Sequence, residues 1–324
     1  MDRPAAADDT YKRMIHALTI DVEDEFNVIA RDWLGREGPP TRAVVDNMER
    51  ILGWLSERNI HATCFVLGEV AEAFPDLIRR IAGDGHELGV HGFRHRQVFK
   101  LTPQTFRNEV EPAKRLIEDL TGRAVLGHRA PAFSIMPETD WALEVLAEVG
   151  FAYDSSIFPI RGRRYGWPDF PLDIHEVRLK SGRSIIEAPL STLTLFGRRW
   201  PACGGGYLRH FPGALTHWAL RRISQYRPVI VYLHPYEIAM TEPWRDTQGL
   251  SRRDASRIRR MYSLQRRNRR TVEPKVLSLL DRYPFAPLGE VIESAIGRPM
   301  AARRNESQTA AASISPTPRV NDFP

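Results

Sequence analysis

The sequence is short of cysteine and has no long apolar run. Its 324 residues include only two cysteines, Cys64 and Cys203, too few for a disulfide framework or a cysteine-ligated zinc site. Any metal must therefore be held by histidine and carboxylate side chains, and a reducing compartment is expected. Residues 1–14 lack the apolar core of a signal peptide, and no stretch approaches 18 consecutive apolar residues. These absences predict a soluble, cytoplasmic protein.

Positive charge is concentrated in one segment. The formal net charge is +6, but Arg252–Arg270 contains nine arginines and one aspartate, so the rest of the chain sums to −2. A local excess of this kind predicts docking on an anionic membrane surface, and hence a membrane-peripheral position. Tyr262 is the one aromatic residue in this segment, so no nucleic acid partner is expected.

Short β-rich runs alternate with longer amphipathic ones, which is typical of βα units around a parallel sheet or barrel. A predicted hairpin spans 174–179 and 184–189, and the tails 1–13 and 300–324 are predicted to be disordered. Strands are predicted at 15–22, 62–67, 87–90, 124–127, 151–153 and 229–233. Helices are predicted at 41–58, 69–82, 102–122, 138–149, 214–225, 274–281 and 288–296.

Polar residues collect directly after the predicted strands, where parallel α/β folds place their active sites. The clusters are T-I-D-V-E-D at 19–24, H-E-L-G-V-H-G-F-R-H at 86–95, R-A-P-A-F at 129–133 and Y-L-H-P at 232–235. His91 and His95 are spaced so that both imidazoles can reach one ion. In the absence of cysteine, imidazole and carboxylate are suitable ligands for a divalent transition metal.

In chain order these clusters resemble the motifs of the polysaccharide deacetylase superfamily, the NodB-homology enzymes of carbohydrate esterase family 4. That family has an aspartate pair after its first strand, then H-[ST]-x-x-H, R-x-P-[FY] and a late Leu-His. This chain has TIDVED, HGFRH, RAPAF and LH between Ile15 and Tyr236. The resemblance implies a metal-dependent hydrolase of non-peptide carbon–nitrogen bonds. The implied α/β fold is a distorted (β/α)7-type barrel over residues 15–240, with a basic helical C-terminal extension over 241–299.

The resemblance implies a divalent metal held by His91, His95 and one carboxylate, Glu23 or Asp24. Zinc is expected first, with Co²⁺, Ni²⁺ or Mn²⁺ as alternatives. In the family the metal-binding aspartate directly follows the base, whereas Val22 stands there in this chain. Glu23 shares the strand face of the preceding Asp21 by alternation, but Asp24 turns in if the strand ends at Val22, so both stay open.

The same resemblance gives the catalytic roles. Asp21 is the base, Arg129 orients it, and His234 is the acid that protonates the departing amine. The aspartate that normally supports this histidine, in a D-x-x-D-W element, has no obvious counterpart, and Asp169 or Glu187 could replace it.

Four further residues are candidates for binding substrate. Pro131, Ala132 and Phe133 belong to the third motif, and the backbone N–H of Ala132 is expected to hold the oxyanion. Phe133 falls one position later than the usual aromatic residue. Arg209, in a glycine-rich loop, is either a substrate ligand or a surface arginine.

A narrower resemblance is to the exopolysaccharide deacetylases of exosortase (PEP-CTERM) loci, whose C-terminal region is of the DUF3473 type. This resemblance rests on four motifs: D-V-E-D, E-A-P-L-S at 187–191, G-G-G-Y-L-R at 204–209 and H-P-Y-E at 234–237. Residues from about 157 to 240 would belong to the DUF3473-type region. The expected substrate is an N-acetylated amino sugar of an exopolysaccharide or cell-envelope glycan, or its lipid-linked precursor. Alternatives are a cyclic amide or imide substrate, and an accessory protein that binds anionic surfaces.

Overall fold

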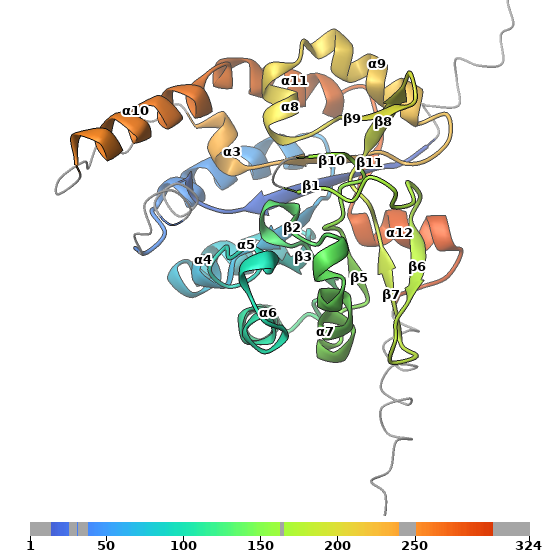
Figure 1. Cartoon of the computed structure of the whole chain (residues 1–324). Coiled ribbons are helices and arrows are strands. Elements are labelled where there is room, and N and C mark those ends of the chain that lie inside the picture. The colour runs from blue at the N-terminus through green and yellow to red at the C-terminus, as the bar shows by residue number, and fades with distance from the viewer. Residues whose placement is uncertain (1–13, 26–30, 32–37, 163–164, 240–250, 301–324) are drawn as a thin grey trace, which may run out of the picture.

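A curled sheet of nine strands forms the centre of the fold (Figure 1). The computed structural model describes residues 14–25, 31, 38–162, 165–239 and 251–300. The order is β10-β1-β2-β3-β4-β5-β7-β6, with β11 beside the start of β1, and β6, which pairs with β7, is the one antiparallel strand of this sheet in the described residues. The strands are β1 (His16–Val22), β2 (Thr63–Val66), β3 (Glu87–Val90), β4 (Gly127–His128), β5 (Tyr153–Asp154), β6 (His175–Arg178), β7 (Ser184–Glu187), β10 (Ile230–Leu233) and β11 (Phe285–Ala286).

Helices cover the outer face of the sheet, and a second hairpin, β8 (Thr192–Leu195) with β9 (Arg198–Pro201), stands apart from it. The helices are α3 (Ala43–Ser56), α4 (Gly68–Ala73), α5 (Pro75–Gly83), α6 (Pro103–Thr121), α7 (Trp141–Val149), α8 (Gly205–His210), α9 (Gly213–Ile223), α10 (Arg252–Arg266), α11 (Val272–Leu280) and α12 (Leu288–Ile296). In the described part of the chain, no helix is both long and apolar enough to cross a bilayer.

Side-chain alternation along β1 separates the two faces of the sheet. Leu18, Ile20 and Val22 pack with the helices in the larger apolar cluster, and Ala17 packs in a smaller cluster inside the curl. Thr19 and Asp21 share the face of Ala17 and are fully buried. The strand therefore directs one carboxylate into the interior of the curled sheet.

Two glycines make room for aromatic rings inside the curl. A Cβ on Gly89 would lie 2.5 Å from the ring of Phe65, and one on Gly127 would lie 2.2 Å from that of Tyr153. Both distances are below van der Waals contact, so any larger residue would displace these rings. The ring centroid of Phe65 in turn lies 4.3 Å from the guanidinium carbon Cζ of Arg129. The aromatic packing inside the curl therefore contacts the polar cluster after β4.

The C-terminal helices return to the sheet. β11 pairs with β1, the N–H of Leu288 donates to Thr63 Oγ1 at 2.6 Å, and that of Gly289 donates to Glu87 Oε2 at 2.9 Å. Thr63 and Glu87 begin β2 and β3. Helix α12 therefore covers the amino ends of these strands and leaves their carboxyl ends to the polar clusters.

The predicted α/β distorted barrel is confirmed. Seven strands, β10, β1, β2, β3, β4, β5 and β7, run parallel. Between β7 and β10 the described residues form isolated contacts in place of a strand ladder. Ile230 N donates to Ser191 Oγ at 2.8 Å, and Gly204 forms a single bridge with Tyr232.

The predicted hairpin of β6 and β7 is present, whereas α8 and the β8–β9 hairpin were not predicted. The basic segment forms α10 and a following 3₁₀ turn. The tails predicted to be disordered, 1–13 and 300–324, lie outside the described residues, except that Met300 is buried.

Candidate metal centre and active site

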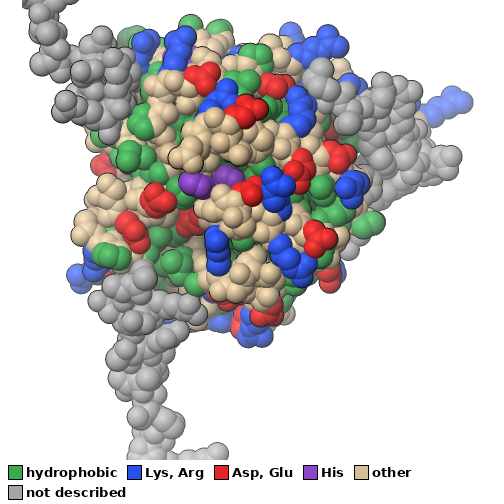
Figure 2. All heavy atoms as spheres, turned by 180° about the vertical axis from the view of Figure 1, so that it is seen from behind, with side chains coloured by type: hydrophobic (Ala, Val, Ile, Leu, Met, Phe, Trp, Pro, Cys, Tyr) green, Lys and Arg blue, Asp and Glu red, His purple; other side chains and the backbone are tan. Residues whose placement is uncertain are grey.

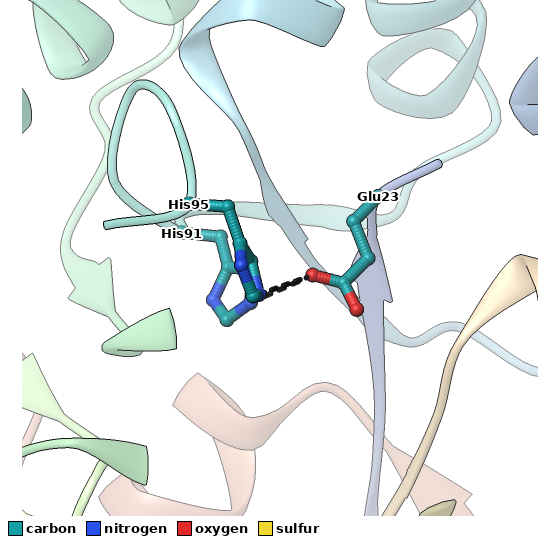
Figure 3. Close-up of side chains that lie close together, drawn as sticks. All are labelled: Glu23, His91 and His95. Carbon is teal, nitrogen blue, oxygen red and sulfur yellow. Dashed lines mark ion pairs between the residues drawn. The ribbon is translucent and has the colours of Figure 1, made fainter. Parts of the chain in front are cut away.

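Three buried side chains converge at the carboxyl ends of β1 and β3. Glu23 Oε2 lies 2.8 Å from His95 Nε2 and 3.4 Å from His91 Nε2, and one ligand atom from each residue lies within 4.8 Å of the others. Figure 3 shows the two imidazoles side by side, facing the carboxylate across a short gap. Two imidazoles and a carboxylate are a suitable donor set for a divalent transition metal.

Local backbone turns bring these three side chains together. Strand β1 ends at Val22, and the N–H of Glu23 donates to the carbonyl of Asp21 at 3.0 Å, so a tight turn sets the direction of Glu23. Gly92 (φ +78°) and His95 (φ +54°) both adopt left-handed conformations in the loop after β3. That loop folds back on itself and places the two imidazole centroids 5.5 Å apart.

The protonation of His91 fits a bound cation. Its Nδ1 lies 2.8 Å from the carbonyl oxygen of Arg129, and a carbonyl only accepts, so Nδ1 carries the proton. In the neutral ring Nε2 is then an electron-pair donor that faces the carboxylate of Glu23. Burial would raise the pKa of Glu23, but His95, His91 and His234 outweigh burial and hold it well below the usual value. The carboxylate is therefore ionised and ready to bind a cation.

A buried ion pair lies beside this group. Arg129 Nη1 donates to Asp21 Oδ1 at 2.8 Å and to Thr19 Oγ1 at 2.7 Å. Its Nε and Nη2 donate to the carbonyl and the hydroxyl of Ser155, both at 3.0 Å. Both members of the ion pair are at most 1% exposed. Arg129 thus fixes one oxygen of Asp21 and leaves Oδ2 directed towards His234, whose Nε2 is 3.7 Å away.

His234 follows β10 and lies among three carboxylates. Its Nε2 is 3.6 Å from Glu23 Oε1, and its Nδ1 is 3.3 Å from Glu237 Oε2. Burial alone would lower the pKa of His234, but Glu237, Glu23 and Asp21 outweigh that effect and raise it to about 9. The imidazole is therefore protonated at neutral pH, as a general acid must be.

Glu237 was not predicted to take part in the site. It is 1% exposed, and besides contacting the ring of His234 it accepts from the backbone N–H of that residue at 3.1 Å. The two residues proposed for this support lie elsewhere. Asp169 is exposed, and Glu187 is buried beside Asp154, where it accepts from the N–H of Ile157. The signal for Glu237 was its spacing, three residues after His234.

The structure separates Asp24 from the metal-ligand group. The Oδ2 atom of Asp24 accepts from the N–H of Thr41 at 2.8 Å, which ties the end of β1 to the start of α3. The next residue, Glu25, forms an ion pair with Arg269. Of the two carboxylates that the sequence left open as metal ligands, Glu23 is the one beside the histidines.

The four candidate substrate-binding residues occupy different environments. Pro131 is buried, and Ala132 is exposed with φ +54°. Phe133 is 7% exposed in an aromatic cluster, with its ring centroid 5.0 Å from that of Tyr232. Arg209 is 8% exposed and donates to the carbonyl of Gln265 at 2.7 Å, so it joins α8 to the end of α10 and is not a free surface arginine.

Two family models match the chain, polysaccharide deacetylase over residues 37–153 and the domain of unknown function DUF3473 over residues 155–293. A peptidoglycan-N-acetylglucosamine deacetylase of Bacillus cereus is 35% identical over 96 residues, which are 29% of this chain and 35% of the relative. A peptidoglycan deacetylase of Helicobacter pylori is 32% identical over 108 residues, 33% of this chain and 36% of the relative. The chain thus aligns with about a third of the length of these relatives.

Two solved structures share the fold. A protein from Mycobacterium smegmatis, described as a polysaccharide deacetylase, superimposes with a TM-score of 0.56 at 20% identity, covering 100% of this chain and 97% of the other. Puue allantoinase superimposes with a TM-score of 0.52 at 17% identity, covering 90% and 94%. At these identities the likeness concerns the fold alone.

The boundary between the two family models runs through the site. His91, His95 and Arg129 lie in the deacetylase match, whereas His234 and Glu237 lie in the DUF3473 match together with β7, β10 and β11. Together with β1, Asp21 and Glu23, which precede both matches, the two matched segments therefore build one sheet and one polar centre. The chain thus matches the polysaccharide deacetylase domain over one segment and the DUF3473 domain over the segment that follows it.

Proposed function

We propose that this protein removes N-acetyl groups from an amino sugar of an exopolysaccharide or cell-envelope glycan. The observation that carries the proposal is the convergence of an oriented carboxylate, a two-histidine and carboxylate ligand set, and a protonated histidine within one buried centre. Amide hydrolysis needs these three functions, because water must be deprotonated, the carbonyl polarised and the departing amine protonated.

The residues divide this work as follows. Asp21 accepts the proton of the attacking water through Oδ2, because Arg129 occupies Oδ1. His234 donates its proton to the nitrogen of the breaking C–N bond, and Glu237 holds that imidazole in place. The N–H of Ala132 stabilises the oxyanion. Glu23, His91 and His95 hold the divalent metal, which when bound lowers the pKa of its water and polarises the carbonyl.

The finer parts of the proposal concern the metal, the glycan and the setting. Zinc is the first choice, because the ligand set is two imidazoles and one carboxylate. An exopolysaccharide precursor, lipid-linked and made by an exosortase-type locus, is the natural acceptor suggested by the sequence cues at 187–191, 204–209 and 234–237. A cytoplasmic, membrane-peripheral enzyme would meet such a precursor before polymerisation.

The basic segment supports a position at an anionic membrane. Eight of the nine arginines of Arg252–Arg270 are exposed, and only Arg269 is buried. In Figure 1 the helix that carries most of them, α10, extends outwards from the body of the molecule. Figure 2 shows acidic and basic side chains interspersed over the opposite face of the molecule, with basic side chains also at its margins. Each exposed arginine near an anionic bilayer contributes about 1 kcal/mol.

Acetate release from N-acetylglucosamine oligomers tests the central proposal. The full chain is stripped of metal, restored with Zn²⁺, Co²⁺, Ni²⁺ or Mn²⁺, and compared with Asp21→Asn and with the surface control Asp281→Asn. We expect metal-dependent release that Asp21→Asn abolishes and Asp281→Asn retains. Hydantoin in the same assay tests the cyclic-imide alternative. Hydrolysis of hydantoin without acetate release would overturn the deacetylase proposal, and so would the absence of metal binding.

A further inference from the structure

The turn of the β8–β9 hairpin carries an aromatic side chain that the fold does not use. Leu195 pairs with Arg198, so Phe196 and Gly197 form a two-residue turn. Their φ angles are +50° and +70°, the combination of a type I′ turn, in which asparagine or glycine is the favoured first residue. Phe196 is fully exposed at this position. A bulky residue with positive φ is a strained choice for the turn, and exposure gives it no packing in return.

Other large apolar side chains lie exposed in the same part of the chain. Trp200 of β9 is 50% exposed, and Leu215 and Trp218, one helical turn apart on α9, are 39% and 40% exposed. Helix α9 packs against β8, so the hairpin and the helix form one unit, which we name the hairpin–α9 surface. Exposed large aromatic residues gathered on neighbouring elements mark an interaction site.

The stretch of sequence that contains the hairpin and α9 carries only positive charge. From residue 188 to residue 236 the sequence contains six arginines and no aspartate, glutamate or lysine. Arg198 lies beside the turn, and Arg221 and Arg222 lie on the exposed side of α9. Exposed Trp and Phe side chains together with exposed arginines are typical of a surface that inserts into the headgroup region of an anionic bilayer.

We propose that the hairpin–α9 surface inserts Phe196 and its neighbouring tryptophans into the interfacial layer of an anionic phospholipid membrane. This contact differs in kind from the electrostatic one proposed for α10. Insertion buries apolar area and survives added salt, whereas attraction between exposed arginines and lipid headgroups is screened by salt. In Figure 1 the hairpin, α9 and α10 all lie along the upper side of the molecule.

Vesicle co-sedimentation of the full chain tests this inference. The vesicles are phosphatidylcholine alone or with about 30% phosphatidylglycerol, the range in which a surface potential recruits basic proteins, and each is assayed at low and high salt. The test variant is Phe196→Asn, since asparagine suits a type I′ turn and preserves the fold. The matched control is Phe99→Ser, which removes a phenylalanine that is 44% exposed elsewhere.

We expect wild type to bind the anionic vesicles and to retain part of that binding at high salt. Phe196→Asn should lose about tenfold in affinity, the effect of one large aromatic side chain, and most clearly at high salt, whereas Phe99→Ser binds as wild type. Acetate release from soluble oligomers should be unchanged in both variants, so a failed deacetylase proposal is seen separately. Equal binding of wild type and Phe196→Asn would overturn the inference. A wild-type dimer that Phe196→Asn converts to a monomer would also overturn it, by assigning the surface to a second copy.

Discussion

The carboxylate of Glu237 lies directly behind the imidazole of His234, and its charge can be removed with little change of shape. The Nδ1 atom of His234 is 3.3 Å from Glu237 Oε2, and this carboxylate is 1% exposed. In Glu237→Gln the amide oxygen can still accept from the N–H of His234, as the carboxylate does at 3.1 Å. We therefore expect the fold to persist and the pKa of His234 to fall.

The size of the effect follows from the distance. An opposite charge within about 4–6 Å shifts a pKa by about 1–3 units. Starting from a pKa of about 9, a loss of about 2 units leaves the pKa of His234 near 7. At pH 8 the protonated fraction then falls from about nine tenths to about one tenth, whereas at pH 6 it stays above about nine tenths. Glu237→Gln should thus lower kcat about tenfold at pH 8 and less than twofold at pH 6.

The assay compares two leaving groups. Acetate release from an N-acetylglucosamine oligomer needs a proton on the departing amine, whereas 4-nitrophenyl acetate releases a phenolate that needs none. We expect Glu237→Gln to slow the amide reaction at high pH and to leave the ester reaction near the wild-type rate. Asp281→Asn is the matched control, because it removes a carboxylate that pairs with Arg58 on the surface.

A pH-independent loss on both substrates would refute this reasoning. It would mean that Glu237 supports the backbone after β10 and has no influence on proton donation. A loss confined to the amide substrate but equal at pH 6 and pH 8 would also contradict it, since the acid would then be mispositioned without any change in its pKa.

Three further predictions address the neighbouring groups. Arg129→Met should lower the free energy of unfolding by about 3–5 kcal/mol, the effect of leaving one member of a buried ion pair uncompensated, as measured by urea denaturation with Asp21→Asn for comparison. His91→Asn should abolish the rise in melting temperature that Zn²⁺ produces in wild type, because a ligand stabilises only the state that binds it; an equal rise in both would place the metal elsewhere. Burial and the neighbouring Asp154 raise the pKa of Glu187 well above its usual value, so the native state binds more protons than the unfolded state above about pH 4 and stability falls as pH rises. Glu187→Gln should flatten that decline between pH 5 and 8 in thermal melts, and an unchanged slope would show that Glu187 is ionised in the fold.

Strong local signals were sufficient to predict much of the fold. All seven residues of β1 are buried, as expected for a parallel strand covered on both faces. Thr102 and Gly122, the ends of the predicted helix 102–122, cap α6. Thr102 is the N-cap and is followed by proline in the first turn, and Gly122 ends the helix in a left-handed conformation. Pro75 divides the predicted helix 69–82 into α4 and α5, because proline cannot extend a preceding helix but can begin one.

The β8–β9 hairpin gave no such signal. Its strands are four residues long, and its turn is Phe-Gly where a turn motif would have asparagine or aspartate before the glycine. A sequence rule based on turn residues therefore does not predict the β8–β9 hairpin. The departure from the rule is informative, since a residue that suits neither the turn nor the core is better explained by a partner outside the chain.

The choice between Glu23 and Asp24 shows where strand periodicity stops being a guide. Side-chain alternation along the strand favours Glu23 as the metal ligand, whereas a strand that ends at Val22 favours Asp24. Each argument depends on where β1 ends. The structure ends the strand at Val22 and still turns Glu23 to the histidines, through the turn closed by the N–H of Glu23 and the carbonyl of Asp21. Three-dimensional contacts with the loop after β3, which no local pattern contains, decide the outcome.

The boundary between the deacetylase match and the DUF3473 match does not separate the residues of the site, because both matched segments contribute side chains to it. Residues 155–293 supply β10, which pairs with β1 directly beside Asp21. They also supply His234 with the buried carboxylate of Glu237, and Arg269, which pairs with Glu25. A chain cut after residue 153 would expose one edge of β1 and remove His234 from beside Asp21. The DUF3473 segment therefore forms the second half of the barrel, and the exposed hairpin and basic helix belong to the same segment that completes the sheet and the polar centre.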